Sequence, residues 1–342
     1  MKRGLTLGKF APLHKGHQYM IETALAEMDE LIILIYDAAE TRVPLHVRAR
    51  WLRELYPAAK VLEAWDGPQI IGDTPAIRRM HEEYILHLLN GETITHFYSS
   101  EFYGEHMSQA LGAVNRLVDP PRQQVPISAT QIRHDPFRWR SYLSPLVYRD
   151  LVTNVVFLGA PSTGKTTLAQ ALASRYKTVW MPEYGREYWE RHQVNRRLAP
   201  EQLLAIARGH LQREEACLLE ANRYLFTDTN ALTTAQFSLD YHGYVLPELD
   251  ELANQVAARY DLVFVCADDI PYADTWDRSG PGKRRVIQKR IIAELKERRI
   301  PYIPLWGTVA ERMTTVDAVL KRWEKADNMG EWVREDGLKK DG

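Results

Sequence analysis

A glycine-containing turn with phosphate-binding spacing follows a predicted strand at two places in this chain of 342 residues. The first is Gly8-Lys9-Phe10-Ala11-Pro12-Leu13-His14-Lys15-Gly16-His17, and the second is Gly159-Ala160-Pro161-Ser162-Thr163-Gly164-Lys165-Thr166. Each stands between an apolar run and a helical pattern, an order that aims backbone N–H groups at an anion. The two turns differ in pattern, so we expect two different nucleotide sites rather than a duplicated one.

Length and composition indicate about two globular domains. A formal net charge of −1 argues against a general binder of nucleic acid or membrane surfaces, although a local basic patch stays open. The two cysteines, Cys217 and Cys266, lie in apolar segments and read as small core residues in a reducing compartment. No apolar run has the length of a membrane span or the form of a signal peptide. We therefore expect a cytoplasmic enzyme.

Apolar runs that alternate with helical patterns predict a mainly parallel sheet flanked by helices in each half. In the first half, a strand at 5–7, a helix over 17–28 and a buried strand at 31–36 form a strand–helix–strand unit with a right-handed crossover. The later predicted strands are 61–64, 95–100, 154–158, 178–180, 223–228, 261–266 and 302–305, and the later predicted helices are 47–56, 166–176 and 286–298.

A fresh α/β pattern starts after residues 145–153, which we take as the boundary between the halves. The predicted domains are therefore residues 1–147 and 148–325. Residues 326–342 are polar and charged with few apolar anchors, and they are predicted to form a tail.

The second turn is a complete Walker A sequence. Its glycines let the backbone curl around a phosphate, Lys165 supplies charge to the β- and γ-phosphates, and the Thr166 hydroxyl can ligate Mg²⁺. A chance match is the competing interpretation, and the flanking strand and helix disfavour it. The predicted ATP-binding residues of this half are Gly159, Pro161, Ser162, Thr163, Gly164, Lys165, Thr166 and Thr167.

The other parts of this phosphoryl-transfer site are less specific. Asp228 ends an apolar strand, where a metal-linked carboxylate is often found, although the same residue suits a turn or helix cap. Glu183 and Arg186 could bind a hydroxyl-bearing substrate, with Glu183 or Asp228 as the base; a solvated loop with an ion pair is the alternative. The loop over 277–285 could close over the phosphates or be an ordinary basic surface loop. The substrate or lid candidates here are Tyr184, Arg186, Arg278, Lys283 and Arg284.

In the first turn, His14 and His17 could meet one triphosphate at the N-terminus of the following helix, with Gly16 allowing close backbone approach. A second segment over 127–133 could cap a helix whose free N–H groups hold phosphates. Ordinary polar loop residues are the alternative for the histidines. Metal ligation is a weaker one, because no cysteine or acidic cluster accompanies them. The predicted ATP-binding residues are Gly8, Lys9, Phe10, His14, His17, Ser128, Thr130 and Arg133.

Together, the first turn and the segment over 127–133 resemble nucleotidyltransferases that join a phosphorylated substrate to a nucleoside monophosphate. With the Walker A sequence and Pro182-Glu183-Tyr184-Gly185-Arg186-Glu187-Tyr188, the chain resembles the NadR-type bifunctional family over roughly residues 5–323. That family joins a nicotinamide-nucleotide adenylyltransferase to a ribosylnicotinamide kinase. The resemblance implies a Rossmann-like N-terminal domain and a C-terminal P-loop kinase domain. Some relatives carry a DNA-binding segment before the first strand, whereas this sequence starts at the strand, so the resemblance is not expected to extend to a repressor role.

The resemblance also implies roles for residues. In the first half, the phosphate of nicotinamide mononucleotide would attack the α-phosphorus of ATP, with His17 nearest that phosphorus and His14 beside it. Lys9, Thr130 and Arg133 would hold the polyphosphate, Gly8 and Phe10 would shape the wall, and Trp65 is a candidate for stacking on the nicotinamide ring, although a core position is the alternative. In the second half, the 5′-hydroxyl of ribosylnicotinamide would take the γ-phosphoryl group. Mg²⁺ is the implied cofactor, and ATP is the co-substrate of both reactions.

Three alternatives stay open. The P-loop half could be an ATP-dependent regulator, or the nucleotidyltransferase could use another acceptor such as phosphopantetheine or flavin mononucleotide. The chain could also be an NAD- or ATP-sensing regulator, which the near-neutral charge disfavours. We expect small-molecule substrates and neither a nucleic-acid nor a membrane partner. A homo-oligomer is left open.

Overall fold

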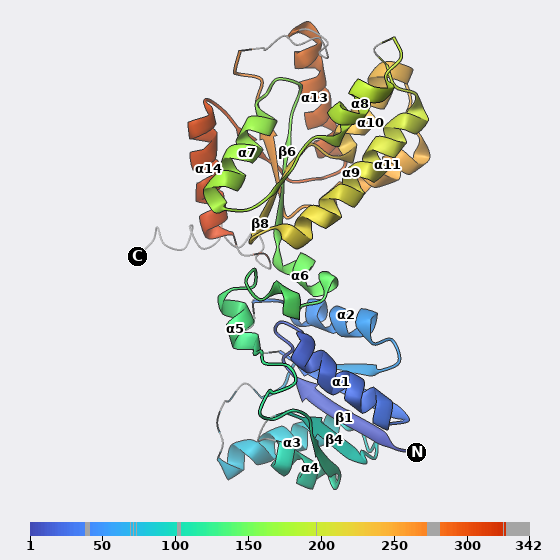
Figure 1. Cartoon of the computed structure of the whole chain (residues 1–342), viewed down its shortest axis with the longest axis vertical. Coiled ribbons are helices and arrows are strands. Elements are labelled where there is room, and N and C mark those ends of the chain that lie inside the picture. Colours follow the sequence, from blue (N-terminus) through green and yellow to red (C-terminus); the bar gives the residue numbers. More distant parts are fainter. Residues whose placement is uncertain are drawn as a thin grey trace. The chain divides into compact units, whose positions relative to one another are not determined.

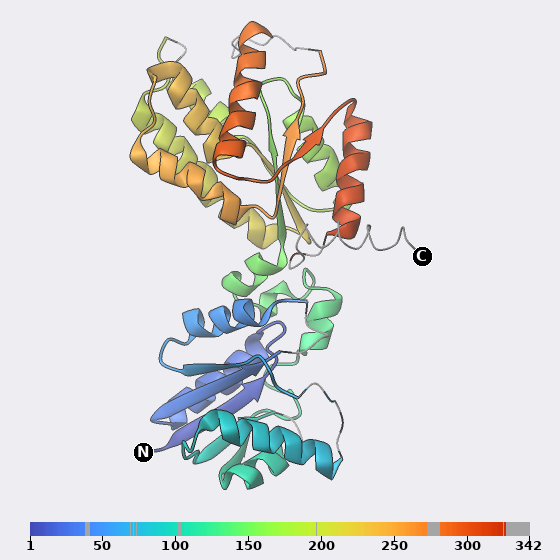
Figure 2. The same ribbon diagram turned by 180° about the vertical axis from the view of Figure 1, so that it is seen from behind.

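The computed structural model describes residues 1–37, 42–68, 70, 72, 74–100, 104–195, 197–271, 281–323 and 325, with the side chains of 281 and 282 excepted. Within these residues the chain divides into two compact units, one over Met1–Tyr148 and one over Arg149–Lys325 (Figures 1 and 2). Each is an α/β unit with a parallel five-stranded sheet, which confirms the predicted fold class. The tail predicted over 326–342 lies outside the described residues.

The sheet of the N-terminal unit has the order β3-β2-β1-β4-β5, and every neighbouring pair is parallel. Leu5 and Leu7 point to one face, where α3 and α4 cover them, and Thr6 points to the other, where it contacts the sulfur of Met20 on α1. The strands are β1 (Arg3–Gly8), β2 (Glu30–Tyr36), β3 (Lys60–Ala64), β4 (His96–Ser99) and β5 (Val114–Leu117). The helices are α1 (Lys15–Glu27), α2 (Leu45–Leu55), α3 (Pro75–Leu89), α4 (Gly104–Leu111), α5 (Ala129–His134) and α6 (Pro145–Leu151), with a 3₁₀ turn at Arg140–Tyr142.

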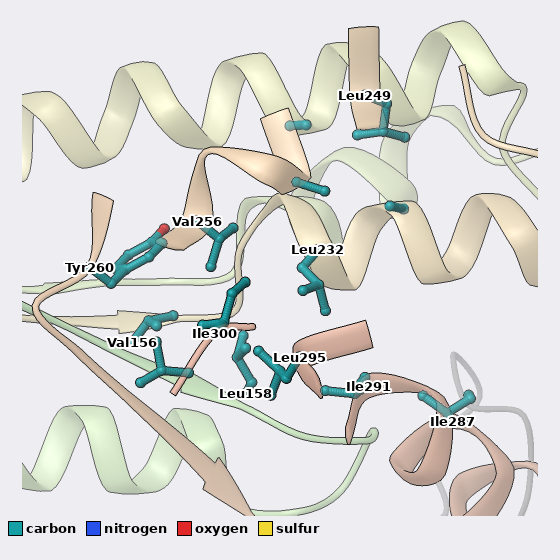
Figure 3. Packing of buried hydrophobic residues seen from close by; sticks show 14 of the residues in the cluster. Val156, Leu158, Leu232, Leu249, Val256, Tyr260, Ile287, Ile291, Leu295 and Ile300 are labelled. Carbon is teal, nitrogen blue, oxygen red and sulfur yellow. The ribbon is translucent and has the colours of Figure 1, made fainter. Parts of the chain in front are cut away.

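The sheet of the C-terminal unit has the order β10-β9-β6-β8-β7 and is also parallel throughout. Val155 and Phe157 face α7 and α14, whereas Val156 and Leu158 face the helices of the opposite layer (Figures 1 and 3). The strands are β6 (Thr153–Leu158), β7 (Trp180–Met181), β8 (Tyr224–Asp228), β9 (Leu262–Cys266) and β10 (Ile303–Leu305). The helices are α7 (Lys165–Tyr176), α8 (Tyr184–His192), α9 (Pro200–Glu220), α10 (Ala231–His242), α11 (Pro247–Asn254), α12 (Val256–Arg259), α13 (Pro281–Glu297) and α14 (Val309–Arg322).

Each phosphate-binding turn follows the central strand of its own sheet. In the N-terminal unit β1 lies between β2 and β4, and in the C-terminal unit β6 lies between β9 and β8. Because the strand order reverses there, the connections diverge and leave a crevice at the carboxyl ends of the strands. The fold thus puts both turns at the edge where doubly wound sheets bind ligands.

The predicted strands match the structure within one or two residues at most of their ends, while several helices, among them α3, α9, α10 and α14, were not predicted. One strand is displaced: the run predicted at 178–180 becomes β7 at Trp180–Met181. Its first residue, Thr178, instead uses its hydroxyl to bond the carbonyl of Tyr224. Among the described residues, no helix combines the length and the apolar character needed to cross a bilayer.

Candidate nucleotide sites of the two units

The two histidines of the N-terminal turn cap helix α1. His14 is the residue before the helix, and its Nδ1 accepts a hydrogen bond from the Gly16 N–H at 3.1 Å. In return, Nδ1 of His17 accepts from the His14 N–H at 3.4 Å, and the two rings stack with centroids 3.8 Å apart. Because both Nδ1 atoms accept, a neutral ring carries its proton on Nε2. The pair is therefore two N–H donors held side by side at a helix N-terminus.

Gly16 is needed for this geometry. A Cβ at position 16 would lie 2.9 Å from Cε1 and 3.1 Å from Nδ1 of His14. The side chain of His14 could then no longer fold back onto the helix end. The glycine thus makes room for the first histidine of the pair.

Burial and nearby arginines keep both imidazoles neutral. Burial is the largest cause that lowers the pKa of His14 to about 4, and the charges of Arg122 and Arg133 add to it. Burial also lowers the pKa of His17 well below its usual value, with His14 and Arg122 contributing. At pH 7 both rings therefore act as neutral hydrogen-bond donors beside two guanidinium groups.

Two arginines, Arg48 and Arg133, donate to carbonyl groups of this turn. Arg48 is fully buried and donates to the carbonyls of Lys9, Val43 and Tyr36. Arg133 donates to the carbonyl of Ala11 at 2.6 Å. Since a turn that presents N–H groups to an anion points carbonyls elsewhere, these donors satisfy them and fix the turn.

The hydrogen bond from Arg133 to the Ala11 carbonyl brings the predicted 127–133 segment next to the turn. Ser128 caps α5 by accepting from the Gln131 N–H, and Arg133 bonds the Thr130 hydroxyl at 3.0 Å. Phe10, with a φ of 46°, packs its ring edge-on against His17 at 5.0 Å. Trp65 lies outside the core: its side chain is exposed and stacks loosely on His46.

The loop that carries Arg122 was not among the predicted site residues. The carboxylate of Asp119 accepts hydrogen bonds from the backbone N–H groups of Gln123, Gln124 and Val125 at 2.8–3.0 Å. This shapes a turn in which Arg122 has a φ of 53° and lies close enough to lower the pKa of both histidines. In the sequence, residues Val118, Asp119 and Arg122 resemble the nucleotidyltransferase half of the family, but that resemblance does not indicate a contact with the histidines.

The C-terminal turn has the backbone of a phosphate-binding loop. Gly159 has a φ of 140°, and a Cβ there would lie 2.6 Å from the carbonyl oxygen of Cys266 at the end of β9. Gly164 precedes α7 with a φ of 81°, a conformation that favours glycine. The Thr163 hydroxyl donates to the Ala160 carbonyl at 2.8 Å and closes the loop.

Lys165, Thr166 and Asp228 come together at the base of this loop. The ammonium group of Lys165 donates to the carbonyls of Gly159 and Ala160 at 2.9 and 3.0 Å. The Thr166 hydroxyl donates to Oδ2 of Asp228 at 2.5 Å, while the buried Oδ1 of Asp228 has no hydrogen-bond partner among the described residues. The Thr166 hydroxyl and the Asp228 carboxylate are oxygen ligands of the kind that Mg²⁺ prefers. A Mg²⁺ ion bound by so few protein groups keeps several waters and also binds phosphate oxygens.

Buried arginines hold the carbonyl groups of this turn as well. Arg312 of α14 donates to the carbonyls of Thr163 and Ala267 and forms an ion pair with Asp269. Arg284, predicted as a lid residue, is buried and donates to the carbonyls of Ser162 at 3.1 Å and Ile270 at 2.9 Å. The two units therefore support their phosphate turns in the same way from unrelated positions in the sequence.

A cavity of about 480 Å³ extends from this loop between α8, α9, α10 and α13. Glu183 and Arg186 line it, with 3.8 Å between their charged groups. Burial raises the pKa of Glu183, and the nearby Asp228 carboxylate raises it further; burial also raises the pKa of Asp228. The residues from the Walker A turn that line the cavity are Gly159, Pro161, Ser162, Thr163, Gly164, Lys165, Thr166 and Thr167.

Other candidates have different surroundings. Tyr184 packs on α9 under the guanidinium of Arg213, which lies 3.9 Å from the ring centre. Lys283 is exposed and reaches Asp240 at 3.5 Å. Arg278 lies outside the described residues. In the described part of the chain, no cluster of three or more His, Cys, Asp or Glu side chains forms a metal site.

Comparison with known families divides the chain in the same way. A family described as "Cytidylyltransferase-like" matches residues 5–135, and one described as "AAA domain" matches residues 154–312.

Curated relatives match almost the whole chain. The "Trifunctional NAD biosynthesis/regulator protein NadR" of Salmonella typhimurium is 30% identical over 335 residues, covering 88% of this chain and 78% of the relative. The protein of the same description from Escherichia coli is 29% identical with the same coverage.

Two solved structures share the fold. A NadR protein in complex with NAD and AMP-PNP is 23% identical with a TM-score of 0.54, and one in complex with NR is 24% identical with a TM-score of 0.56. Each alignment covers 94% of this chain and 95% of the other. At this identity the likeness concerns the fold alone.

Proposed function

Because this chain belongs to the NadR family of NAD biosynthesis proteins, we propose that its two units catalyse two consecutive steps of that synthesis. The C-terminal unit phosphorylates ribosylnicotinamide with ATP, and the N-terminal unit transfers the adenylyl group of ATP to the resulting mononucleotide to give NAD and pyrophosphate. The observation that carries the proposal is the presence of two different phosphate turns, each at the carboxyl edge of its own parallel sheet. Residues 1–147 and 148–325 are the proposed domains.

The adenylyl transfer needs positioning and charge stabilisation rather than a protein nucleophile. The phosphate of the mononucleotide is already an anion, and it would attack the α-phosphorus of ATP as the bond to pyrophosphate breaks. We assign the Nε2–H groups of His14 and His17 to the phosphate oxygens, where charge builds up in the transition state. Lys9, Thr130 and Arg133 hold the polyphosphate, and Arg122 adds a charge that the sequence did not reveal.

The phosphoryl transfer uses the cavity of the C-terminal unit. Lys165, which bonds two loop carbonyls at 2.9 and 3.0 Å, would exchange them for the β- and γ-phosphate oxygens. The 5′-hydroxyl of the acceptor would enter from the side of Glu183, whose raised pKa makes its carboxylate a stronger base than an ordinary one. With Glu183 as the base, Asp228 is assigned to binding the metal ion.

Mg²⁺ fits the residues at the base of the loop. Thr166 and Asp228 would hold it, since the Asp228 carboxylate has one oxygen on the threonine hydroxyl and one without a hydrogen-bond partner. When bound, the ion supplies a positive charge that neutralises the phosphate oxygens of the donor. The protein's own part is to orient both oxygen ligands: Asp228 is fixed at the buried end of β8, and Thr166 in the first turn of α7.

The direct test is to incubate the protein with ribosylnicotinamide, ATP and Mg²⁺ and to follow the products by mass spectrometry. The proposal predicts mononucleotide and ADP first, then NAD and pyrophosphate. Release of pyrophosphate with phosphopantetheine or flavin mononucleotide instead would contradict the assigned acceptor. ATP binding without any phosphate transfer to ribosylnicotinamide would reduce the C-terminal unit to a regulatory domain.

A further inference from the structure

Three buried polar side chains that line the cavity each have one atom without a hydrogen-bond partner in the described part of the chain. His210 of α9 is 6% exposed, and Thr233 and Gln236 of α10 are 6% and 5% exposed. All three line the cavity. The atoms His210 Nε2, Thr233 Oγ1 and Gln236 Oε1 are buried and make no hydrogen bond within the described chain.

Two buried polar groups on the same helices are satisfied, whereas Nδ2 of Asn230, the cap of α10, also has no partner among the described residues. On the same helix, the Ser238 hydroxyl donates to the carbonyl of Tyr244 at 2.8 Å. One turn along α9 from His210, the buried carboxylate of Glu214 accepts from Asn154, Thr227, Arg259 and Tyr260. Buried polar groups are hydrogen-bonded almost everywhere in folded proteins, because an unmade bond costs the desolvation of the group. Three such atoms facing one cavity therefore indicate polar groups of a ligand.

The chemistry of the three side chains selects an uncharged ligand group. An amide oxygen accepts, a hydroxyl both donates and accepts, and a neutral imidazole does one or the other at Nε2. Burial lowers the pKa of His210, which keeps the ring neutral at pH 7. None of the three carries a charge, so together they suit vicinal hydroxyl groups better than a phosphate or a carboxylate.

Position along α10 indicates which part of the acceptor they meet. Asp228 ends β8, and Asn230 caps the helix that follows. Thr233 lies in the first turn and Gln236 one turn later on the same face, a rise of about 4.5 Å. Two aromatic side chains of α10 also line the cavity, Phe237 and Tyr241, and both follow Gln236 along the helix.

The other side of α10 is apolar and anchored. Leu232 and Ala235 belong to the core cluster under the sheet, with Leu232 pointing into it in Figure 3. The face that carries Thr233 and Gln236 is therefore fixed toward the cavity. From its N-terminal end, which follows β8, this face carries a hydroxyl, an amide and then aromatic rings, an order that matches the ribose diol and the planar base of the acceptor.

We propose that His210, Thr233 and Gln236 bind the 2′- and 3′-hydroxyls of the acceptor's ribose and make the kinase selective for ribonucleosides over deoxyribonucleosides. The inference rests on the proposed kinase function. It assigns three specificity-determining residues that lie outside both phosphate motifs.

The test compares ribosylnicotinamide with its 2′-deoxy and 3′-deoxy analogues as kinase substrates. In the unmodified protein, loss of at least one hydroxyl is expected to lower kcat/KM by about tenfold or more. The near-isosteric changes Gln236→Met and Thr233→Val should lower kcat/KM for the ribonucleoside and narrow its advantage over the deoxy analogue to about twofold. Ser238→Ala, on the same helix but away from the cavity, should keep the full advantage.

Urea unfolding of each variant serves as the folding check for the C-terminal unit, and adenylyl transfer from mononucleotide, which takes place in the other unit, serves as the internal standard for protein concentration. Equal use of the ribo and deoxy substrates by the unmodified protein would overturn the inference alone. The inference would also be overturned if Gln236→Met and Thr233→Val lowered kcat/KM by the same factor for ribosylnicotinamide and for both deoxy analogues. Selectivity that instead follows removal of the carboxamide from the ring would assign the three side chains to the base and also overturn it. No phosphorylation of ribosylnicotinamide at all would remove the kinase function together with the inference.

Discussion

At the scale of single residues, buried arginines are the part of both sites that the sequence did not reveal. The motifs predicted the groups proposed to bind phosphate, because those have a fixed spacing. Arg48 and Arg312 instead donate to carbonyls behind the turns, from helices 39 and 149 residues away in the sequence. In the sequence, an arginine that will be buried cannot be distinguished from an exposed arginine of an amphipathic helix, because its carbonyl acceptors come close only in the folded protein.

Replacement of Arg312 by methionine should impair the kinase through the loop rather than through a direct contact. It leaves the carbonyls of Thr163 and Ala267 without their donor, which should destabilise the C-terminal unit by ~1–3 kcal/mol and lower kinase kcat/KM. Urea unfolding and steady-state kinetics measure the two effects. Arg312→Lys should restore part of the activity. Unchanged kinase kinetics in Arg312→Met would show that the carbonyl contacts do not support the loop.

The histidine pair allows a prediction about protonation. The lowered pKa values mean that the folded protein keeps His14 and His17 neutral as the pH falls through 6.5, where the unfolded chain would take up protons. Folding therefore loses stability on acidification from pH 6.5 toward about 4, the folded pKa of His14. Long-range ¹H–¹⁵N NMR spectra should show both rings as Nε2–H tautomers that do not titrate between pH 6 and 8. A midpoint near 6.5, or an Nδ1–H tautomer, would contradict the capping geometry.

At the scale of elements, apolar periodicity predicted the buried strands well, and it failed where function replaces apolar residues. The buried strands β2 and β6 consist mostly of apolar residues and were predicted at nearly their observed bounds. Helices α9 and α10 bury His210 and Gln236 on the faces that line the cavity. Polar residues at buried positions interrupt the helical pattern, so these elements were missed together with the residues proposed here to bind the acceptor.

Helix α9 also contains a glycine whose role appears only in the packing. Gly209 lies in the middle of the helix, where glycine costs about 1 kcal/mol relative to alanine. A Cβ there would lie 3.1 Å from Cδ1 of Tyr184 and closer still to Cε1. Tyr184 follows Glu183 directly, and the guanidinium of Arg213, one turn along α9 from Gly209, lies 3.9 Å from its ring centre. The glycine thus lets α8 dock and positions the carboxylate beside it.

Gly209→Ala should therefore destabilise the protein by ~1–3 kcal/mol, although helix propensity alone predicts stabilisation. The displaced Tyr184 should also move Glu183 and lower the kcat of the kinase. Urea unfolding of Gly209→Ala, Tyr184→Ala and the double variant measures the coupling. When Tyr184 is also alanine, Gly209→Ala should leave the free energy of unfolding unchanged or increase it, because the ring that the new Cβ would meet is absent. A stabilised single variant would contradict the docking role of the glycine.

At the scale of the whole molecule, the account depends on two ATP sites that work separately. The N-terminal unit adds an adenylyl group, and the C-terminal unit adds a phosphoryl group to make the substrate of the first. The sequence predicted this division, because each phosphate motif is local and carries its own flanking strand and helix. It could not predict the cavity walls, which combine segments from 159 to 290 that meet only in the folded unit.

Product analysis of two single variants tests this claim most directly. Lys165→Ala should leave ribosylnicotinamide unphosphorylated yet convert supplied mononucleotide to NAD at nearly the unmodified rate. His17→Ala should phosphorylate ribosylnicotinamide normally and accumulate mononucleotide, with the kcat of adenylyl transfer reduced on the order of 10²-fold and its KM changed far less. Loss of both reactions in either variant, with the protein still folded, would contradict two separate sites.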